Sequence, residues 1–363
     1  MNDIRIGLVG CGRIAKRHSE LLGYNQIKGA CLTAVCDLVK EKSEKIGAAF
    51  NVPYYTNMHE MMKKEALDAV SILTPSGIHA ENVIELAPYQ KHLIVEKPMA
   101  LTLDDADAMI AACDANDIKL FIIKQNRFNL PVMKLREAMI QGRFGKLVMG
   151  TVRVRWCRPQ HYYDLDPWRG TWANDGGVLT NQASHHIDLL EWMMGDVESV
   201  FAKSRTALVD IETEDTAVVT LQFTNGALGI IEATTAARPK DLEGSISILG
   251  EKGTVVIGGF AVNEMKTWNF LEEIESDRDV MEQYSVNPPN VYGFGHQAYY
   301  ENVVDCLQHN KNQLVDGLTG RKSLEVIMAI YESIETGKEV FLRFKPNKCK
   351  LGNKSIGLEE DGV

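Results

Sequence analysis

The chain has 363 residues, of which 45% are hydrophobic and 24% charged, a composition typical of a globular protein with room for two domains. Its formal net charge of −10 argues against nucleic acid as a partner. No apolar run approaches the length of a membrane helix, and no charged leader precedes an apolar segment at the N-terminus, so we expect a cytoplasmic protein without a membrane partner.

In the first 125 residues, short apolar runs alternate with helical patterns. The apolar runs are continuous, as expected for strands that are buried on both faces of a parallel sheet. The pattern therefore predicts a doubly wound, Rossmann-type α/β domain. Its strands are expected at 4–9, 31–36, 53–55, 69–73, 92–95 and 119–123, and its helices at 13–22, 39–50, 58–64, 78–87 and 103–115.

Beyond residue 131 the pattern changes to a period of two. In one long run, Val148, Val152, Val154 and Trp156 fall mostly on one face and Arg153 and Arg155 on the other, which suggests a sheet with one buried face. We therefore predict an α+β domain built on a large, mostly antiparallel open sheet. Its strands are expected at 147–156, 197–202, 216–223, 228–234, 245–249 and 254–257, and its helices at 132–141, 177–194, 294–309 and 324–336.

These patterns divide the chain into two domains and a tail. Residues 1–125 are expected to bind a dinucleotide, and residues 126–344 to bind substrate and support assembly. The last helical segment, 324–340, could pack back on the first domain. The polar segment 345–363 is expected to be poorly ordered.

A glycine-rich turn follows the first predicted strand. Gly10 permits a tight turn, Gly12 lets a pyrophosphate approach the backbone, and Ala15 allows the helix to pack closely on the sheet. Asp37 ends the second strand, where a carboxylate can accept from both ribose hydroxyls and repels a 2′-phosphate, so NAD is predicted as the cofactor. The alternative is a plain glycine turn with an N-capping aspartate.

Two further loops are expected at the same edge of the sheet, because each follows a parallel strand. Thr74 and Pro75 follow the fourth strand, and His79 starts the next helix. Glu96 and Lys97 follow the fifth strand. Since Lys97 precedes a proline, it is biased toward an extended conformation that projects it toward the nicotinamide. There it could share a substrate hydroxyl's proton, while Glu96 could orient Lys97 or accept from the ribose.

A second polar group lies on the helix predicted at 177–194. Asn181, His185 and Asp188 have the spacing i, i+4, i+7 and share one face, whereas His186 points roughly 100° away. His185 is the natural general base, because imidazole titrates near neutral pH. A buried structural role remains open for His185, His186 and Asp188. No metal site is predicted, because a third ligand with helical spacing is missing and the seven cysteines form no C-x-x-C pair.

One basic region stands out in this acidic chain. Residues 124–169 contain ten Lys or Arg and three acids, a local charge of +7. The region could be an ordinary solvated face or a pocket for an anionic substrate.

Three elements follow one another along the sequence: the glycine-rich turn, the loop with Glu96 and Lys97, and the segment from Asn181 to Asp188. With these elements in this order, the sequence resembles the glucose–fructose oxidoreductase / inositol dehydrogenase / rhizopine catabolism (Gfo/Idh/MocA) family over about residues 3 to 344. The resemblance implies that Lys97 and His185 act on a sugar hydroxyl while hydride passes to or from NAD(P). It also implies that Trp168 and Arg169 reach the cofactor from the second domain. Many members have an aspartate where this chain has Asn181, and an amide cannot take a proton. We also assign three residues to the cofactor site: Arg13, Ile14 and Gln125.

Several segments are similar to one subgroup of that family, the WlbA-type dehydrogenases. The subgroup oxidises the C3 hydroxyl of UDP-N-acetyl-2-amino-2-deoxy-D-glucuronate, and an aminotransferase then uses the ketone on the way to the 2,3-diamino uronic acids of surface polysaccharides. Family members commonly assemble through the open sheet of the second domain, so a homotetramer is implied. The similar segments are 9–16, 124–129, 168–172, 181–185, 242–246 and 292–296.

The substrate implied by this resemblance carries a diphosphate and a carboxylate, which would give the basic region a role. Beside Lys97, Asn181 and His185, we assign two groups of residues to substrate. The anion partners are expected among Arg127, Arg155, Arg158 and Arg238, and the sugar contacts among Gln160, Tyr163 and Tyr292.

The function predicted by these patterns is the NAD-dependent oxidation of a UDP-sugar acid at C3. Three alternatives stay open. The first is the same chemistry on a free polyol or sugar such as inositol, which would leave the arginines without a role. The second is a non-catalytic dinucleotide-binding regulator, and the third an NAD-dependent glycosidase.

Overall fold

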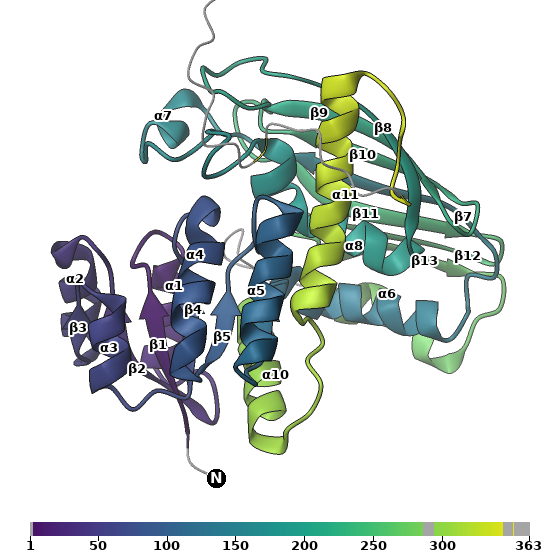
Figure 1. Ribbon diagram of the computed structural model, residues 1–363. Helices are drawn as coiled ribbons and strands as arrows, with labels where there is room; N and C mark the ends of the chain where they lie inside the picture. The colour runs from purple at the N-terminus through teal and green to yellow at the C-terminus, as the bar shows by residue number, and fades with distance from the viewer. Residues whose placement is uncertain (1–2, 286–293, 344–350, 352–363) are drawn as a thin grey trace, which may run out of the picture.

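The computed structural model describes residues 3–285, 294–343 and 351 and contains two domains, each built around one sheet (Figure 1). The first domain has a six-stranded parallel sheet in the order β3-β2-β1-β4-β5-β6. This is the predicted doubly wound arrangement. The strands are β1 (Ile4–Val9), β2 (Ala30–Cys36), β3 (Tyr54–Tyr55), β4 (Ala69–Ile72), β5 (His92–Val95) and β6 (Leu120–Ile122).

The helices of the first half connect consecutive strands, as βαβ crossovers require. Their predicted ranges agree with the structure to within a few residues. The α-helices are α1 (Ala15–Gly23), α2 (Lys40–Phe50), α3 (Met58–Lys64), α4 (His79–Leu86) and α5 (Leu103–Ala115). Continuous apolar runs such as β4, all four residues of which are buried, made these strands easy to locate from sequence.

The second domain has an eight-stranded sheet in the order β13-β12-β11-β7-β10-β9-β8-β14. All neighbours are antiparallel except β7 and β10, which run parallel. The strands are β7 (Leu147–Arg155), β8 (Val197–Arg205), β9 (Thr216–Phe223), β10 (Leu228–Thr234), β11 (Glu243–Gly250), β12 (Gly253–Gly258), β13 (Glu264–Phe270) and β14 (Val340–Phe341). The helices of this half are α6 (Leu130–Ile140), α7 (Gln160–Tyr163), α8 (Ser184–Met194) and α9 (Val280–Gln283).

One face of this sheet is covered and the other is open. Val152 and Val154 are fully buried on the covered face, where α8 packs against β7 and β11. Arg153 and Arg155 lie on the opposite face and contact Glu232 on β10. The alternation read from the sequence therefore predicted the faces of the second half of β7 correctly, whereas Val148, near the start of the strand, is 53% exposed.

The last two long helices are α10 (Gly295–His309) and α11 (Gly317–Thr336), and α11 contacts both domains. The sequence placed α10 with the second domain, but its Tyr300 and Val303 share an apolar core with Ile6 and Leu8 of β1. The helix α10 covers the first sheet because its buried apolar side chains pack against the apolar side chains of that sheet. The helix α11 packs on α5 at one end and on β8 at the other (Figure 1).

Several elements were not predicted. The strand β13 carries polar residues at too many positions to show a clean alternation, and α7, α9 and β14 are very short. The helix expected at 177–194 is interrupted: residues Val178–Gln182 form a single π-helical turn, η4, and α8 begins at Ser184.

None of the helices in the described residues is long and apolar enough to cross a membrane. The predicted poorly ordered tail, 345–363, lies outside the described residues except for Leu351, which is buried against the core.

Candidate active site

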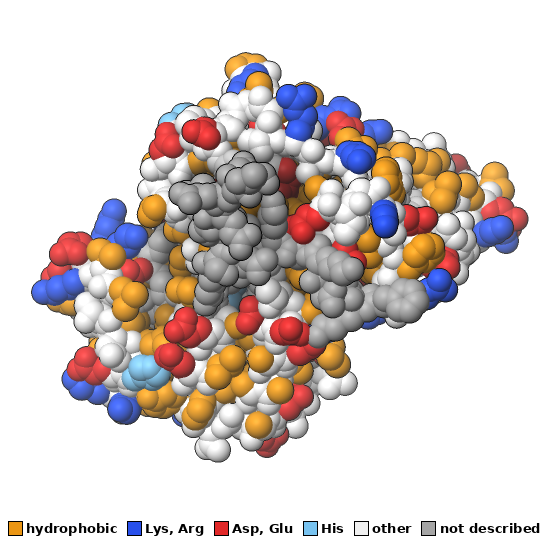
Figure 2. Space-filling model, turned by 45° about the horizontal axis from the view of Figure 1, so that its top comes forward, with side chains coloured by type: hydrophobic (Ala, Val, Ile, Leu, Met, Phe, Trp, Pro, Cys, Tyr) orange, Lys and Arg blue, Asp and Glu red, His pale blue; other side chains and the backbone are white. Residues whose placement is uncertain are grey.

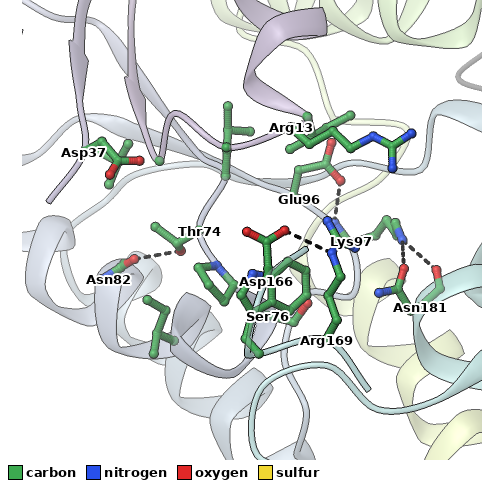
Figure 3. A pocket seen from close by; sticks show the side chains of 18 of the residues that line it. Arg13, Asp37, Thr74, Ser76, Asn82, Glu96, Lys97, Asp166, Arg169 and Asn181 are labelled. Atoms are coloured by element: carbon green, nitrogen blue, oxygen red, sulfur yellow. Dashed lines mark hydrogen bonds and ion pairs between the residues drawn. The ribbon is translucent and has the colours of Figure 1, made fainter. Parts of the chain in front are cut away.

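A cavity of about 730 Å³ lies between the two domains. It is lined on one side by the carboxyl ends of β1, β2, β4 and β5, and on the other by segments of the second domain. Figure 3 shows Asp37 at one end of this cavity and Lys97 facing Asn181 at the other. A cavity outside the carboxyl ends of parallel strands is where this type of sheet binds ligands.

The glycine-rich turn leaves room for a ligand at its open side. Gly10 has φ +96°, and a Cβ there would come within 2.8 Å of the backbone of Leu73. A Cβ at Gly12 would meet nothing within 4 Å, so the space before its backbone is open. No side chain caps α1, and both Arg13 and Ile14 line the cavity. These features fit a dinucleotide pyrophosphate at the N-terminus of α1.

Asp37 lines the cavity just beyond the end of β2. Its Oδ2 accepts from the N–H of Cys11 at 2.7 Å, and its Oδ1 accepts from the N–H of Val39 at 2.8 Å. These bonds fix the carboxylate beside the glycine-rich turn, and each oxygen keeps a lone pair for a further donor. The position fits recognition of an adenosine ribose.

The loop after β4 contributes two of its three predicted residues to the cavity. Thr74 and Pro75 line it, and the Thr74 hydroxyl donates to Asn82 at 2.9 Å. His79 is not among the lining residues: its two ring nitrogens lie 2.9 Å from the carbonyl oxygens of Thr74 and Pro98. Burial lowers the pKa of His79, while the two carbonyl oxygens act in the opposite direction. A neutral imidazole donates to one of these oxygens, so His79 has a structural place between the two loops.

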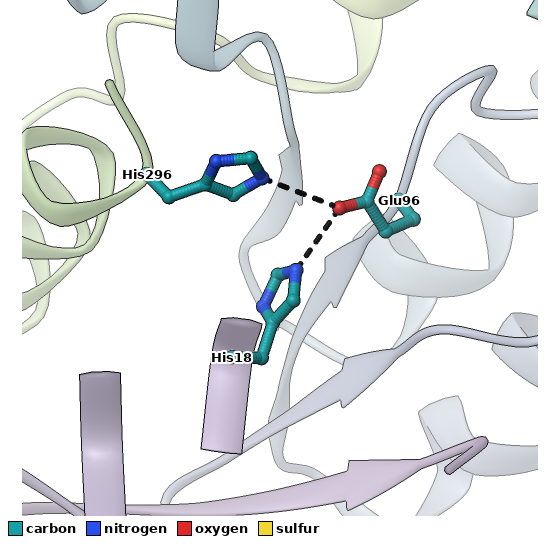
Figure 4. Close-up of side chains that lie close together, drawn as sticks. All are labelled: His18, Glu96 and His296. Carbon is teal, nitrogen blue, oxygen red and sulfur yellow. Dashed lines mark hydrogen bonds and ion pairs between the residues drawn. The ribbon is translucent and has the colours of Figure 1, made fainter. Parts of the chain in front are cut away.

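Glu96 is held by a buried cluster of histidines (Figure 4). Its Oε1 lies 3.0 Å from Nε2 of His18 and 3.7 Å from Nε2 of His296, and its Oε2 accepts from the N–H of Lys97 at 2.9 Å. Burial raises the pKa of Glu96, but the bonds from both histidines outweigh burial and hold this pKa well below its usual range. The ionised carboxylate thereby fixes the backbone that carries Lys97.

Among the residues that the structure describes, His18, Glu96 and His296 also bring three possible metal-ligand atoms within 4.8 Å of one another. His18 is engaged on both ring nitrogens, because its Nδ1 lies 2.7 Å from the hydroxyl of Tyr300. Hydrogen bonds to Tyr300, Glu96 and Lys97 account for these contacts of His18 and Glu96, and we assign no ion to the group.

Lys97 reaches across the cavity to the second domain. Its Nζ donates to the backbone oxygen of Asn181 at 2.6 Å, with Oδ1 of Asn181 at 3.4 Å. Burial lowers the pKa of Lys97, while the charges of Glu96 and Asp175 act in the opposite direction. The amine is therefore easier to deprotonate than a free lysine and keeps a fixed position.

The π-helical turn η4 changes the spacing that the sequence suggested. The N–H of Ala183 bonds to the oxygen of Val178 at 2.8 Å, which is an i→i+5 bond, so Asn181 and His185 do not belong to one regular α-helix. Both residues nevertheless line the cavity. The i, i+4 argument was wrong in its geometry although it selected two residues of the same cavity.

His185 is buried and lies 3.0 Å from the side-chain nitrogen of Gln125. Burial, together with the positive charges of Lys97 and Lys124, holds the pKa of His185 well below its usual range. The imidazole is therefore neutral at physiological pH and has the protonation state that a general base requires. Gln125 also lines the cavity, as predicted for a residue close to the cofactor.

Three arginines gather around one tyrosine at the cavity wall. The guanidinium groups of Arg13, Arg158 and Arg169 lie 6.0, 5.4 and 4.6 Å from the centre of the Tyr162 ring. Arg169 also donates to the Tyr162 hydroxyl at 2.7 Å. Trp168 lines the same wall. This end of the cavity can accept a negatively charged group.

The structure directs two other predicted anion partners elsewhere. Arg127 is 2% exposed and donates to Asp188 at 2.7 and 2.8 Å, with Lys124 at 3.5 Å from the same carboxylate. Arg155 donates to Glu232 at 2.6 Å on the open face of the second sheet. Neither arginine lines the cavity. Asp188 thus belongs to a buried ion cluster.

The remaining substrate candidates also lie outside the main cavity or outside the described residues. Gln160 and Tyr163 line a smaller cavity of about 340 Å³ on the other side of Arg169. Arg238 donates to the carbonyl oxygen of Thr235 at 3.0 Å. Tyr292 is not among the described residues.

The local charge of +7 is largely balanced, because six of the ten basic residues pair with acids from other parts of the sequence. Acidic and basic side chains are interspersed on the face shown in Figure 2. The six are Lys124, Arg127, Arg143, Arg153, Arg155 and Arg158, whereas Lys134 and Arg169 pair with Glu137 and Asp166 of the same region.

Some residues of the site were missed by sequence reasoning. Asp175 belongs to no recognised sequence motif, but it is 2% exposed and accepts a hydrogen bond from the side chain of Asn181. Tyr162 was passed over for its neighbour Tyr163, although only Tyr162 lines the main cavity. His18 is one turn into α1 and showed no signal beyond its place on the buried face of that helix.

Comparisons with known proteins agree with this geometry. Residues 4–123 match the family described as "Oxidoreductase family, NAD-binding Rossmann fold", and residues 136–342 match its "C-terminal alpha/beta domain". The chain is 31% identical over 358 residues to myo-inositol 2-dehydrogenase of Thermotoga maritima, covering 93% of this chain and 98% of that protein.

Two solved structures are similar to the chain over nearly its whole length. The WlbA dehydrogenase of Bordetella pertussis, in complex with NADH and UDP-GlcNAcA, is 42% identical with a TM-score of 0.90, covering 94% of this chain and 98% of that one. The WlbA dehydrogenase of Chromobacterium violaceum, in complex with the same two ligands, is 41% identical with a TM-score of 0.88, covering 94% and 96%.

The two family domains cover most of the chain in the predicted order, and the cavity lies between them at the carboxyl ends of the parallel strands. The protein uses NAD to act on the CH–OH group of a sugar or polyol, which removes a non-catalytic regulator from the possible functions. The chain belongs to the Gfo/Idh/MocA family of oxidoreductases.

Proposed function

We propose that this protein oxidises the C3 hydroxyl of UDP-N-acetyl-2-amino-2-deoxy-D-glucuronate (UDP-GlcNAcA) to the 3-keto sugar with NAD. The observation that carries the proposal is Arg158 on the wall of the cavity that also contains Lys97, because Arg13 and Arg169 on the same wall are assigned to NAD. Arg158 is paired with Asp241 at 2.9 Å, and a substrate carboxylate or diphosphate offers it a further anionic partner, which a neutral polyol does not. The similarity to two WlbA dehydrogenases supports the same choice.

The side chains at the other end of the cavity suit the removal of a proton from an alcohol. Neutral His185 accepts the proton of the C3 hydroxyl. Lys97 donates a hydrogen bond to the hydroxyl oxygen and stabilises the negative charge that develops on it. NAD, when bound, accepts the hydride that leaves C3. The products are the ketone, NADH and a proton.

Positions at the cofactor end are proposed to bind NAD. Gly10, Gly12, Arg13 and Ile14 would hold the pyrophosphate, and Asp37 the adenosine ribose. Thr74 and Pro75 would lie beside the nicotinamide ribose, and the proposed contacts of the nicotinamide itself are Glu96, Gln125, Trp168 and Arg169.

A second candidate is the oxidation of a free polyol, which the identity to a myo-inositol 2-dehydrogenase favours. NADH formation with UDP-GlcNAcA, UDP-GlcNAc and myo-inositol separates the two. We expect kcat/KM for UDP-GlcNAcA to exceed that for UDP-GlcNAc by about 10- to 100-fold, the value of one charge-assisted contact to the carboxylate. Turnover of myo-inositol at the rate of UDP-GlcNAcA would contradict the proposal. Sugar release without net NADH formation would instead indicate the glycosidase.

We further propose that the enzyme works in the cytoplasm as a homotetramer and that its ketone supplies an aminotransferase in lipopolysaccharide (2,3-diamino uronic acid) biosynthesis. The open face of the second sheet supports assembly, because it exposes Phe201, Val218 and Leu228 at 39, 52 and 57%. Light scattering after size-exclusion chromatography should give about four times the monomer mass of 40.5 kDa. A monomer at micromolar concentration would contradict this assembly.

A further inference from the structure

An acidic side chain outside every recognised motif lies behind Asn181. Asp175 is almost completely buried in the loop between Trp168 and η4. Its Oδ2 accepts from the N–H of Gly170 at 2.8 Å, and its Oδ1 accepts from Nδ2 of Asn181. Asn181 in turn accepts from Nζ of Lys97 through its backbone oxygen and, at 3.4 Å, through Oδ1. A carboxylate, an amide and an amine are thus linked by a series of hydrogen bonds that ends in the cavity.

The hydrogen-bonding groups in this series permit only one orientation of the Asn181 side-chain amide. An ionised carboxylate only accepts hydrogen bonds and an ammonium group only donates them. The Nδ2 of Asn181 must therefore face Asp175, which leaves Oδ1 facing Lys97. Without the carboxylate, the amide could turn and present a donor to the amine, which would push Lys97 away from this position.

We propose that Asp175 is a positioning residue for Lys97 and acts through Asn181. Residue 181 of this protein is a neutral asparagine. Asp175 supplies the negative charge instead, one hydrogen bond further from the amine. Asp175 itself is not among the residues that line the cavity. The inference rests on the proposed role of Lys97 in catalysis and deepens it by naming what holds the amine.

The surroundings of both groups agree with this role. Lys97, Arg169, Tyr162 and Glu214 face Asp175. Burial raises the pKa of Asp175 to about 6, while its two hydrogen bonds and the charges of Lys97 and Arg169 limit that rise. Asp175 is therefore ionised above about pH 6.

The charges around Lys97 come from several elements. Glu96 and Asp175 raise its pKa, and Lys124 and Arg169 lower it. His185 is neutral and adds no charge. Removal of the carboxylate at position 175 therefore lowers the pKa of Lys97 and shifts its deprotonation to lower pH.

The test compares Asp175→Asn with the double variant Asp175→Asn/Asn181→Asp, which moves the carboxylate one link along the chain into direct contact with the amine. We expect Asp175→Asn to lower kcat by about 10- to 100-fold with KM for NAD unchanged, and the double variant to recover most of that loss. A residue that only stabilised the fold would not be rescued in this way. Thermal unfolding of both variants shows whether they fold.

A second measurement needs no substrate. The rate of Lys97 acylation, followed by peptide mass spectrometry as a function of pH, should have its midpoint at lower pH in Asp175→Asn than in the wild type. An unchanged midpoint together with an unchanged kcat would overturn the inference. If the wild type fails to oxidise UDP-GlcNAcA, the proposed function falls, and the acylation midpoint still decides the role of Asp175.

Discussion

Lys97→Met is expected to abolish almost all turnover while the enzyme still binds NAD. Methionine keeps a chain of similar length but removes the amine that donates to Asn181 and, in the proposed reaction, to the substrate hydroxyl. Loss of a proton-transfer or alkoxide-stabilising group commonly costs about 10²–10⁴-fold in kcat. NADH formation measures this loss, and a fluorescence titration measures NAD affinity.

A suitable control is Lys16→Met, because the side chain of Lys16 is exposed on α1 and its ion pair with Glu20, at 3.8 Å, lies on the surface of the same helix. This variant should keep the wild-type kcat. A near-normal kcat in Lys97→Met, or a loss that disappears at saturating NAD, would remove Lys97 from the chemistry.

His185→Asn is expected to lower kcat by about 10²–10³-fold, because asparagine cannot accept the substrate proton. The chain offers a matched control in His186, which is adjacent, fully buried and next to the ring of Trp156 but not among the residues that line the cavity. His186→Asn should lower the thermal unfolding temperature and leave kcat close to the wild-type value. The opposite pattern, a catalytic loss at 186 with none at 185, would exchange the two roles.

The pH dependence of the wild type follows from the same site. Because burial and the charge of Lys97 lower the pKa of His185, the histidine stays neutral below its ordinary pKa of about 6.5. The acid limb of kcat/KM assigned to His185 should therefore lie below that pH. In Lys97→Met the positive charge is gone, so the pKa of His185 rises, and an NMR titration of this histidine should show the increase.

The sequence located the ligand-binding edge of the first sheet well, because continuous apolar strands mark their own ends. Lys97 is the second residue after β5, and Asp37 is the first residue after β2. The glycine pattern added the third loop at this edge. These predictions needed only local patterns, which is why they transferred to the structure.

Residue roles that depend on distant partners could not be predicted in the same way. The sequence made Arg127 a reasonable anion partner, but in the structure its guanidinium donates to Asp188, 61 residues away. Arg155 followed a period of two that correctly put it on the open face of the sheet, yet the pattern alone could not say that the cavity lies on the other side. The partner of a long cation is set by the tertiary fold.

The π-helical turn explains why Asp175 was overlooked. Sequence spacing treated 177–194 as one helix and looked for partners of Asn181 at i+4 and i+7. The extra residue in η4 breaks that register, and the partners of Asn181 come from a loop before the helix and from the other domain. Irregular turns of this kind are frequent at functional sites.

A crystal structure with NAD and UDP-GlcNAcA bound tests the central claim most directly. The account predicts that C3 of the sugar lies about 3–3.5 Å from C4 of the nicotinamide, with its hydroxyl oxygen in hydrogen-bond distance of both Lys97 Nζ and a ring nitrogen of His185. A sugar seated with C3 far from the nicotinamide, or with either nitrogen directed away from the hydroxyl, would contradict it.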